Sequence, residues 1–178
     1  MVTTLVCHPD TPCPVALTIR VQVTPGAAGG LIIEYLVDAP PAALRLPPPA
    51  LASRCDGLWR QTCCEAFMLG EGGPAYREFN FSPSGAWQAY AFSAYRAGGP
   101  LHPAPAPAIR LDLEPAAFRL TATLPTGLLP PGRQLRLGLS AVIEASDGSL
   151  SYWALRHPPG KPDFHHTDGF ALQIALNP

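Results

Sequence analysis

The stretch "TCCEAFMLGEGGPAYREFNFSPSGAWQAYAF", residues 62–92, decides the fold because three strand-like runs in it are separated by turn residues. The runs cover 62–70, 76–83 and 86–96. Side chains alternate between the two faces of a strand, so Phe79 and Phe81 share one face, with Arg77, and are predicted to lie in the core. The sequence Ser-Pro-Ser-Gly at 82–85 is typical of a tight turn. The stretch therefore predicts short consecutive strands.

The rest of the chain continues this pattern. Residues 16–24 alternate between apolar and polar as in a half-buried strand, and 31–38 are apolar on both faces, as in a more central strand of an opening hairpin. The Asp147-Gly148 pair indicates a further hairpin turn, because glycine tolerates a positive φ angle. The remaining predicted strands are 109–114, 118–125, 135–145, 150–156 and 169–176. The fold class predicted is all-β, an antiparallel β-sandwich of jelly-roll or immunoglobulin-like type.

Proline and glycine are abundant, with 23 and 16 residues, which argues against long helices. The Pro-rich segments 38–53, 98–108 and 125–133 are predicted to be rigid surface connections, and 47–59 to contain one short helical turn. The chain of 178 residues, 1–178, is expected to form a single domain.

Composition also narrows the function classes. Twelve Lys and Arg are scattered singly among thirteen Asp and Glu, so no nucleic-acid partner is indicated. No apolar run approaches the length of a membrane helix, and the N-terminus lacks secretory features, so we expect no membrane association and a cytoplasmic location. The odd cysteine count without paired CxxC spacing predicts reduced, buried thiols at Cys7, Cys13, Cys55, Cys63 and Cys64.

A motif within residues 56–92 carries a family resemblance. A Trp is followed after six residues by a Glu and then by an aromatic residue, Y-x-E-F and Pro-x-Gly. These are Trp59, Glu65, Phe67, Tyr76, Glu78, Phe79, Pro83 and Gly85. The pattern resembles the DOMON-like domains and the related family-nine carbohydrate-binding modules, and "LSYWALRHPPGKPDFHH" (150–166) resembles a small bacterial DOMON-like subgroup. The resemblance implies a β-sandwich that binds a sugar or haem.

A saccharide site needs an aromatic surface for the sugar ring and polar side chains for its hydroxyl groups. Trp59 would supply the surface, unless it is a core or rim aromatic. Glu65 either forms a structural ion pair, plausibly with an Arg, or faces a cleft. The candidate ligand-binding residues are Trp59, Glu65, Arg77, Arg156, His157, Lys161, Asp163 and His165. The hypothesis requires Trp59, Glu65 and the 156–166 loop to meet at one cleft.

Other chemistries are less well supported by the residues. Adjacent His165 and His166 would point in opposite directions in an extended chain, so we expect no metal site. Glu65 and Glu78 are expected to project differently, which argues against a glycosidase pair, and no catalytic residue is assigned. Haem could be held by Met68 with His165 or His166, as the DOMON resemblance implies, but no cofactor is expected.

The sequence thus predicts a non-catalytic module for a saccharide or another small polar ligand. The first alternative is a protein-interaction module without a small ligand, with the His-rich loop at the rim of its contact surface. The second alternative is a haem-binding DOMON domain.

Overall fold

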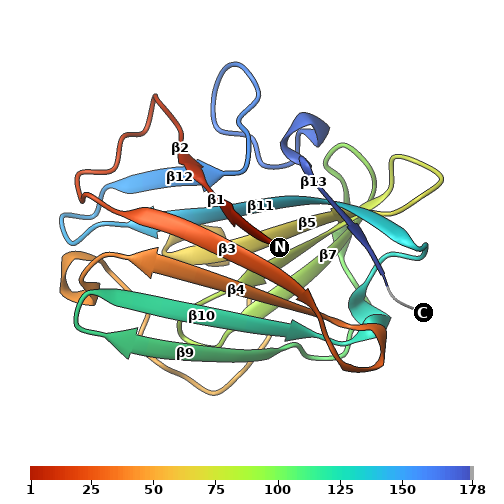
Figure 1. Cartoon of the computed structure of the whole chain (residues 1–178), viewed down its shortest axis with the longest axis horizontal. Coiled ribbons are helices and arrows are strands. Elements are labelled where there is room, and N and C mark those ends of the chain that lie inside the picture. Colours follow the sequence, from red (N-terminus) through yellow and green to blue (C-terminus); the bar gives the residue numbers. More distant parts are fainter. Residues whose placement is uncertain (177–178) are drawn as a thin grey trace.

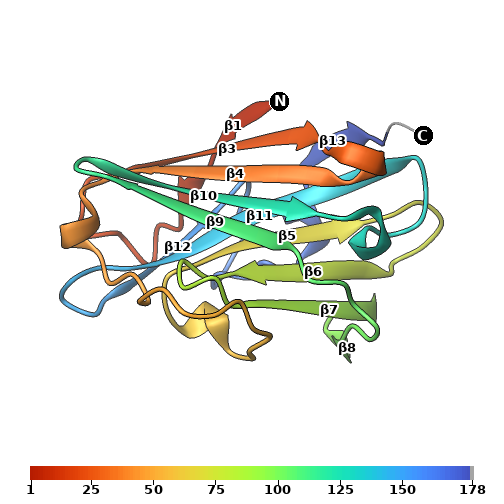
Figure 2. The ribbon, with the colours of Figure 1, turned by 90° about the horizontal axis from the view of Figure 1, so that it is seen from below.

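The computed structural model describes residues 1–176 and consists of two antiparallel β-sheets packed face to face (Figures 1 and 2). The five-stranded sheet has the order β1 (Val2–Thr4), β3 (Thr18–Pro25), β4 (Leu31–Asp38), β10 (Ala117–Leu124), β9 (Ala108–Glu114). The second sheet has the order β2 (Val6–Cys7), β12 (Leu150–Ala154), β11 (Gln134–Glu144), β5 (Cys63–Leu69), β6 (Tyr76–Phe81), β7 (Trp87–Ala94), β8 (Ala97–Pro100), and β13 (Leu172–Ala175) also pairs with β11.

The helical elements within the described residues are single 3-10 turns in the connections. They are η1 (Ala27–Gly29), η2 (Pro41–Ala43), η3 (Leu58–Arg60), η4 (Thr126–Leu128) and η5 (Thr167–Gly169). None of the helices in residues 1–176 has the length and apolar character needed to span a bilayer. The predicted β-sandwich is therefore confirmed.

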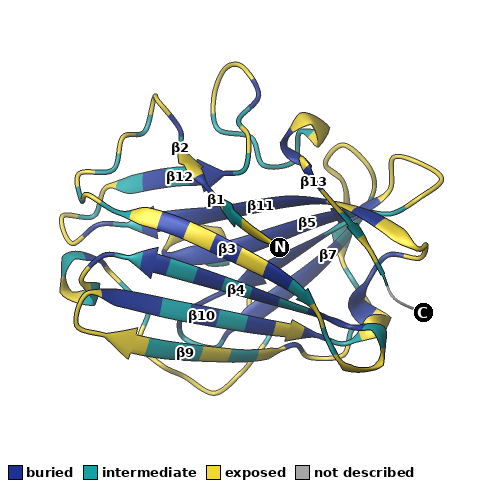
Figure 3. Cartoon of the chain, in the orientation of Figure 1, coloured by how far each residue is buried: buried dark blue, intermediate teal, exposed yellow. Residues whose placement is uncertain are grey.

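The core between the sheets follows from the alternation of the strands. Ile19, Val21 and Val23 of β3 point inward, while the polar residues between them are exposed. In the opposing sheet, Phe79 and Phe81 of β6 point into the same core, as predicted. Figure 3 shows the contrast: the central strands are mostly buried, whereas the loops and β9 are largely exposed. Burial of these side chains is the main stabilisation of the sandwich.

Both faces of the second sheet are buried, although one of them points away from the core between the sheets. Six consecutive residues of β5, from Cys63 to Met68, are buried. An antiparallel sheet with a solvent-facing side alternates between apolar and polar residues. Because β5 lacks this alternation, another part of the chain must cover the outer face of the second sheet. The cover is the connection between β12 and β13, aided by η3.

The position of that connection follows from strand pairing. β5 pairs with one edge of β11, so β12 at Ser140–Glu144 and β13 at Gln134–Leu137 share the other edge. The chain between them, residues 155–171, leaves the sheet edge and returns to it, and its Phe164 and His165 rings contact Phe67 on the outer face. We call residues 155–171 the covering loop.

Ten of the strands coincide with predicted runs, apart from their ends. The short strands β1, β2 and β8 were not predicted, and η3 provides the short helical turn at the end of the predicted segment. The Asp147-Gly148 turn is confirmed, with Gly148 at φ +91° and Asp147 accepting a hydrogen bond from the Ser149 amide. The prediction of buried thiols holds for Cys63 and Cys64, whereas Cys7 and Cys13 are only half-buried. Cys55 is exposed, because it lies in the loop before η3 and not in a strand.

Candidate ligand-binding site

The outer face of the second sheet carries an apolar cluster of its own, separate from the sandwich core. Phe67, Tyr76 and Phe170 are buried there and pack with Leu69, Phe92 and Phe164. Phe170 anchors the covering loop over β11, where a Cβ atom on Gly138 would lie only 2.6 Å from the Phe170 ring. A glycine in a strand interior often marks such a close approach. The cluster fixes one wall of a cavity.

A cavity of about 470 Å³ opens beside this cluster, between the sheet, η3 and the covering loop. Its walls are strongly aromatic, with Trp59, Phe67, Tyr90, Phe92, Tyr152 and Phe164. The carboxyl, guanidinium and imidazole side chains that line it are those of Glu65, Glu78, Arg96 and His165. A concave, mainly apolar pocket with a few polar groups is the usual form of a small-molecule site.

Glu65 and Glu78 form the acidic floor of the cavity. Glu65 on β5 pairs across the sheet with Asn80 on β6, so Glu78 is its diagonal neighbour on the same face. The expectation that the two carboxyl groups project differently is therefore wrong, because two antiparallel strands in this register present both to one side. The residues are only 3% and 5% exposed, respectively.

Both carboxyl groups hold their protons more tightly than usual. Burial, and then the charge of Glu78, raises the pKa of Glu65 well above its ordinary value. Burial also raises the pKa of Glu78 to about 7, against smaller opposing effects of Asn80 and Arg96. Glu65 Oε1 is buried without a hydrogen-bond partner among the described residues. Of the two alternatives for Glu65, the structure shows the one in which it faces a cleft, because no salt bridge to Glu65 occurs within residues 1–176.

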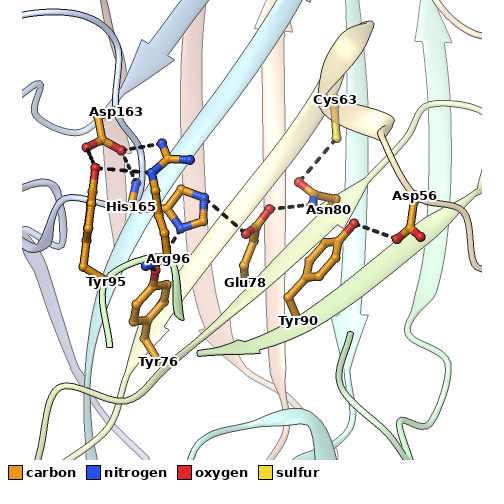
Figure 4. A network of polar contacts seen from close by, with 10 residues as sticks. All are labelled: Asp56, Cys63, Tyr76, Glu78, Asn80, Tyr90, Tyr95, Arg96, Asp163 and His165. Atoms are coloured by element: carbon orange, nitrogen blue, oxygen red, sulfur yellow. Dashed lines mark hydrogen bonds and ion pairs between the residues drawn. The ribbon is translucent and has the colours of Figure 1, made fainter. Parts of the chain in front are cut away.

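His165 connects the acidic floor to the covering loop (Figure 4). The Arg96 amide donates to the Tyr76 hydroxyl (3.1 Å), which lies 2.8 Å from His165 Nδ1. If Tyr76 donates this bond, His165 carries its proton on Nε2, which faces Glu78 Oε2 at 3.6 Å. Burial lowers the pKa of His165 to about 4, so the ring is neutral at pH 7. Asn80 Nδ2 completes the chain with a 2.8 Å bond to Glu78 Oε1.

Asp163 fastens the covering loop to the turn between β7 and β8. It accepts hydrogen bonds from Tyr95 Oη at 2.7 Å and from Arg96 Nη2 at 2.9 Å (Figure 4). It also accepts one from the backbone amide of His165, at 3.1 Å. These bonds lower the pKa of Asp163, although burial alone would raise it. Asp163 thus positions His165 without itself lining the cavity, whereas its partner Arg96 does line it.

Trp59 stands at the opposite wall and is 40% exposed. Its ring meets Tyr90 edge to face, with centroids 6.1 Å apart. Tyr90 is held in turn by Asp56, whose Oδ1 accepts from the Tyr90 hydroxyl at 2.9 Å and from Gln88 Nε2 at 2.7 Å. A half-exposed indole beside a fixed tyrosine offers a flat apolar surface to a ligand.

The structure brings three of the predicted site residues to one cavity: Trp59, Glu65 and His165. Asp163 lies just behind His165. The required meeting of Trp59, Glu65 and the loop at one cleft is thus present.

Four predicted residues lie elsewhere. Arg77 is directed away from the cavity, because it shares the inner face with Phe79, and donates to the backbone oxygens of Gly127 and Leu129. Arg156 and His157 border a shallow depression formed with residues 6–10, where His157 Nε2 lies 2.8 Å from the oxygen of Val6. Lys161 is exposed at the tip of the covering loop and does not line the cavity.

Sequence reasoning missed most of the aromatic walls. Tyr90 and Phe92 lie on β7 and Tyr152 on β12, and their alternation with inward-facing residues could have placed them on the face of Glu65. Phe164 and Arg96 carry no such signal, because their positions depend on a loop and a turn.

The proposed haem ligands are not brought together. Met68 belongs to the core between the sheets, whereas His165 lies over the outer face. Neighbouring strand residues point to opposite faces, and Met68 is an odd number of positions from Glu65. Met68 therefore lies on the opposite side of the second sheet from the covering loop that carries His165 and His166. Within residues 1–176 no group of three or more His, Cys, Asp and Glu side chains is arranged to hold a metal ion.

Comparison with known proteins places the fold. No family model and no curated protein matches the chain. Among solved structures it is similar to a proposed carbohydrate-binding protein from Bacteroides uniformis ATCC 8492, with a TM-score of 0.72 and 15% identity over 99% of this chain and 86% of that one.

Two further structures are of a family 9 carbohydrate-binding module from Caldicellulosiruptor kristjanssonii. The complex with glucose has a TM-score of 0.62 at 11% identity and covers 93% of this chain and 80% of the module. The complex with cellotriose has a TM-score of 0.60 at 12% identity and covers 94% and 77%. The chain therefore has the β-sandwich fold of carbohydrate-binding modules.

Proposed function

We propose that this protein is a non-catalytic module that binds a saccharide in the cavity on the outer face of its second sheet. The observation that carries the proposal is the combination of a half-exposed Trp59 and other aromatic walls with a polar floor in one cavity. Aromatic faces bind the apolar C–H side of a sugar ring, and carboxyl groups take its hydroxyls. The known saccharide complexes of the family 9 module with the same fold support this assignment. The Trp59 motif further supports a DOMON-like type.

The position of the two acids favours binding over hydrolysis. Glycosidases place their carboxyl groups on the two sides of the bond that is cleaved. Here Glu65 and Glu78 are diagonal neighbours on one sheet face, so both would lie beneath the same side of a ligand. We propose that Trp59 stacks on the sugar, that Glu65 and Glu78 accept its hydroxyls and that His165 contacts its edge.

Calorimetric titration of the purified protein with glucose and with cello-oligosaccharides tests the proposal. Trp59→Ala removes the stacking surface, and loss of an aromatic–ligand contact of about 1–1.5 kcal/mol should weaken binding about tenfold. Lys161→Ala is the matched control, since it truncates an exposed side chain outside the cavity, and it should bind like the wild type.

Two results would overturn the proposal. One is the absence of binding to every member of a broad glycan array. The other is saccharide binding that Trp59→Ala leaves intact while the Arg156→Ala variant loses it, because that would place the site at the depression near residues 6–10.

A further inference from the structure

The acidic floor lacks a cation of its own. Glu78 has only His165 as an ion-pair partner among the described residues, and His165 is neutral near pH 7. Arg96 influences Glu78 from a distance, but its guanidinium is bound to Asp163 and its side chain is 52% exposed. Two adjacent carboxyl groups in a buried site cannot both ionise without a compensating positive charge.

One carboxyl oxygen of the acidic floor is free to accept a hydrogen bond from a ligand. Glu65 Oε1 has no hydrogen-bond partner among residues 1–176, and Glu65 is almost fully buried while lining the cavity. An unsatisfied buried acceptor costs about 1–3 kcal/mol, and more when it is charged. A ligand that donates to this oxygen would remove that cost.

The walls above the floor also suit a positive charge. Trp59, Tyr90, Phe92 and Phe164 present aromatic rings to the cavity. The faces of such rings attract cations, and rings around an acidic group form the usual receptor for an ammonium ion. Neutral hydroxyl groups could also donate to the floor, but they would not stabilise the charged form of the two carboxyl groups.

We propose that the ligand of this cavity carries a protonated amine, as in an amino sugar, and that the amine binds between Glu65 and Glu78. The inference rests on the proposed saccharide function and names its ligand class. Charge-assisted hydrogen bonds are about twice as strong as neutral ones. The site therefore favours an amino sugar over the neutral sugar of the same shape.

Binding of the amine is coupled to proton release. The other titratable groups facing the two acids are Cys63 on β5, Tyr76 and Tyr90 on β6 and β7, Arg96 in the following turn, and His165 with Asp163 on the covering loop. In the free protein, most of Glu78, with a pKa of about 7, is protonated at pH 6, and burial favours the protonated form of Glu65 as well. An ammonium ion stabilises the charged forms of Glu65 and Glu78, so its binding releases a proton from these acids. A neutral sugar leaves their protonation unchanged.

The test compares the β-1,4-linked trimer of glucosamine with cellotriose by isothermal titration at pH 6, where an amine with a pKa of about 7.7–8.0 is charged. We expect the glucosamine trimer to bind about tenfold more tightly. The measured binding enthalpy of the glucosamine trimer should differ between buffers of different ionisation enthalpy, because the buffer takes up the released protons. The binding enthalpy of cellotriose should be the same in all of them.

Glu65→Gln and Glu78→Gln should each weaken binding of the glucosamine trimer by more than binding of cellotriose, because the amide can still accept a hydroxyl but carries no negative charge for the ammonium ion. Glu114→Gln is the matched control, since Glu114 lies at the end of β9 in the other sheet. If cellotriose binds as tightly as the glucosamine trimer, or if the trimer binds without proton release, this inference is wrong and the proposed function stands. If neither trimer nor any neutral saccharide binds, the proposed function fails as well.

Discussion

At the scale of single residues, Glu78 and His165 face each other with pKa values displaced in opposite directions by the same cause. Burial penalises the charged form of each group. For the acid this raises the pKa, so the folded state binds more protons than the unfolded state above pH 4.5. For the imidazole it lowers the pKa, so the folded state binds fewer protons below pH 6.5. The two groups therefore destabilise the fold at opposite ends of this pH range.

Glu78→Gln isolates the contribution of the acid. The stability that wild-type Glu78 contributes is fully present below pH 4.5 and is lost as pH rises through about 7, a change of about 3 kcal/mol. The variant lacks this loss, so its free energy of unfolding relative to the wild type should increase across that window. Urea denaturation at several pH values measures the difference.

His165→Gln supplies the opposing control. Its stability relative to the wild type should increase as pH falls from 6.5 toward 4, by about 2 kcal/mol after allowance for the solvent that reaches the ring. Parallel curves for Glu78→Gln and the wild type between pH 4.5 and 7 would show that Glu78 titrates normally.

At the scale of elements, alternation predicted the strands and the faces of their residues. It grouped Arg77 with Phe79 and Phe81 on the inner face, as the structure has them. Including Arg77 among the site residues contradicted that same alternation.

The cavity walls were harder to predict because they come from the covering loop. Its path depends on where β13 returns to β11 and on the space that Gly138 leaves for Phe170. Both are contacts between residues distant in sequence, and local pattern does not encode them. Glu78 was noticed as an acid, but its position beside Glu65 depends on the register of β5 and β6.

Asp163→Ala tests how the covering loop is held. The substitution removes acceptors for Tyr95, Arg96 and the His165 amide, and we expect faster amide hydrogen exchange across residues 155–171. Because the partners are half exposed, global stability should fall by only about 1 kcal/mol. Ligand affinity should fall as well, since His165 would be less fixed. Lys161→Ala, in the same loop, should leave exchange unchanged, and unaltered exchange in Asp163→Ala would assign the anchoring to Phe170 instead.

At the scale of the whole molecule, the two sheets differ in how many of their faces are buried. The five-stranded sheet contributes its inner face to the core and leaves its outer face to solvent, whereas the second sheet has two buried faces, one for the core and one for the cavity. Composition and strand number indicated a sandwich but not this asymmetry. It arises because the covering loop, residues 155–171, folds over the outer face of the second sheet and returns to the edge of β11.

One buried hydrogen bond crosses between the sheets directly beneath the cavity. Tyr35 of β4 is fully buried and donates to the backbone oxygen of Glu65 on β5 at 2.6 Å. Buried tyrosine hydroxyls generally need such a partner. Tyr35→Phe keeps the ring and removes the bond, so it should lower the free energy of unfolding by about 1–2 kcal/mol in urea denaturation. Saccharide affinity should not change, because the hydroxyl lies on the core side of the sheet.

Tyr152→Phe is the complementary variant, since Tyr152 lines the cavity and its hydroxyl has no hydrogen-bond partner among residues 1–176. It should leave stability unchanged. If Tyr35→Phe weakened ligand binding at a temperature where it is fully folded, the cross-sheet bond would be setting the position of Glu65. The core-facing and cavity-facing sides of the second sheet would then be coupled through β5, and packing in the core would influence ligand affinity.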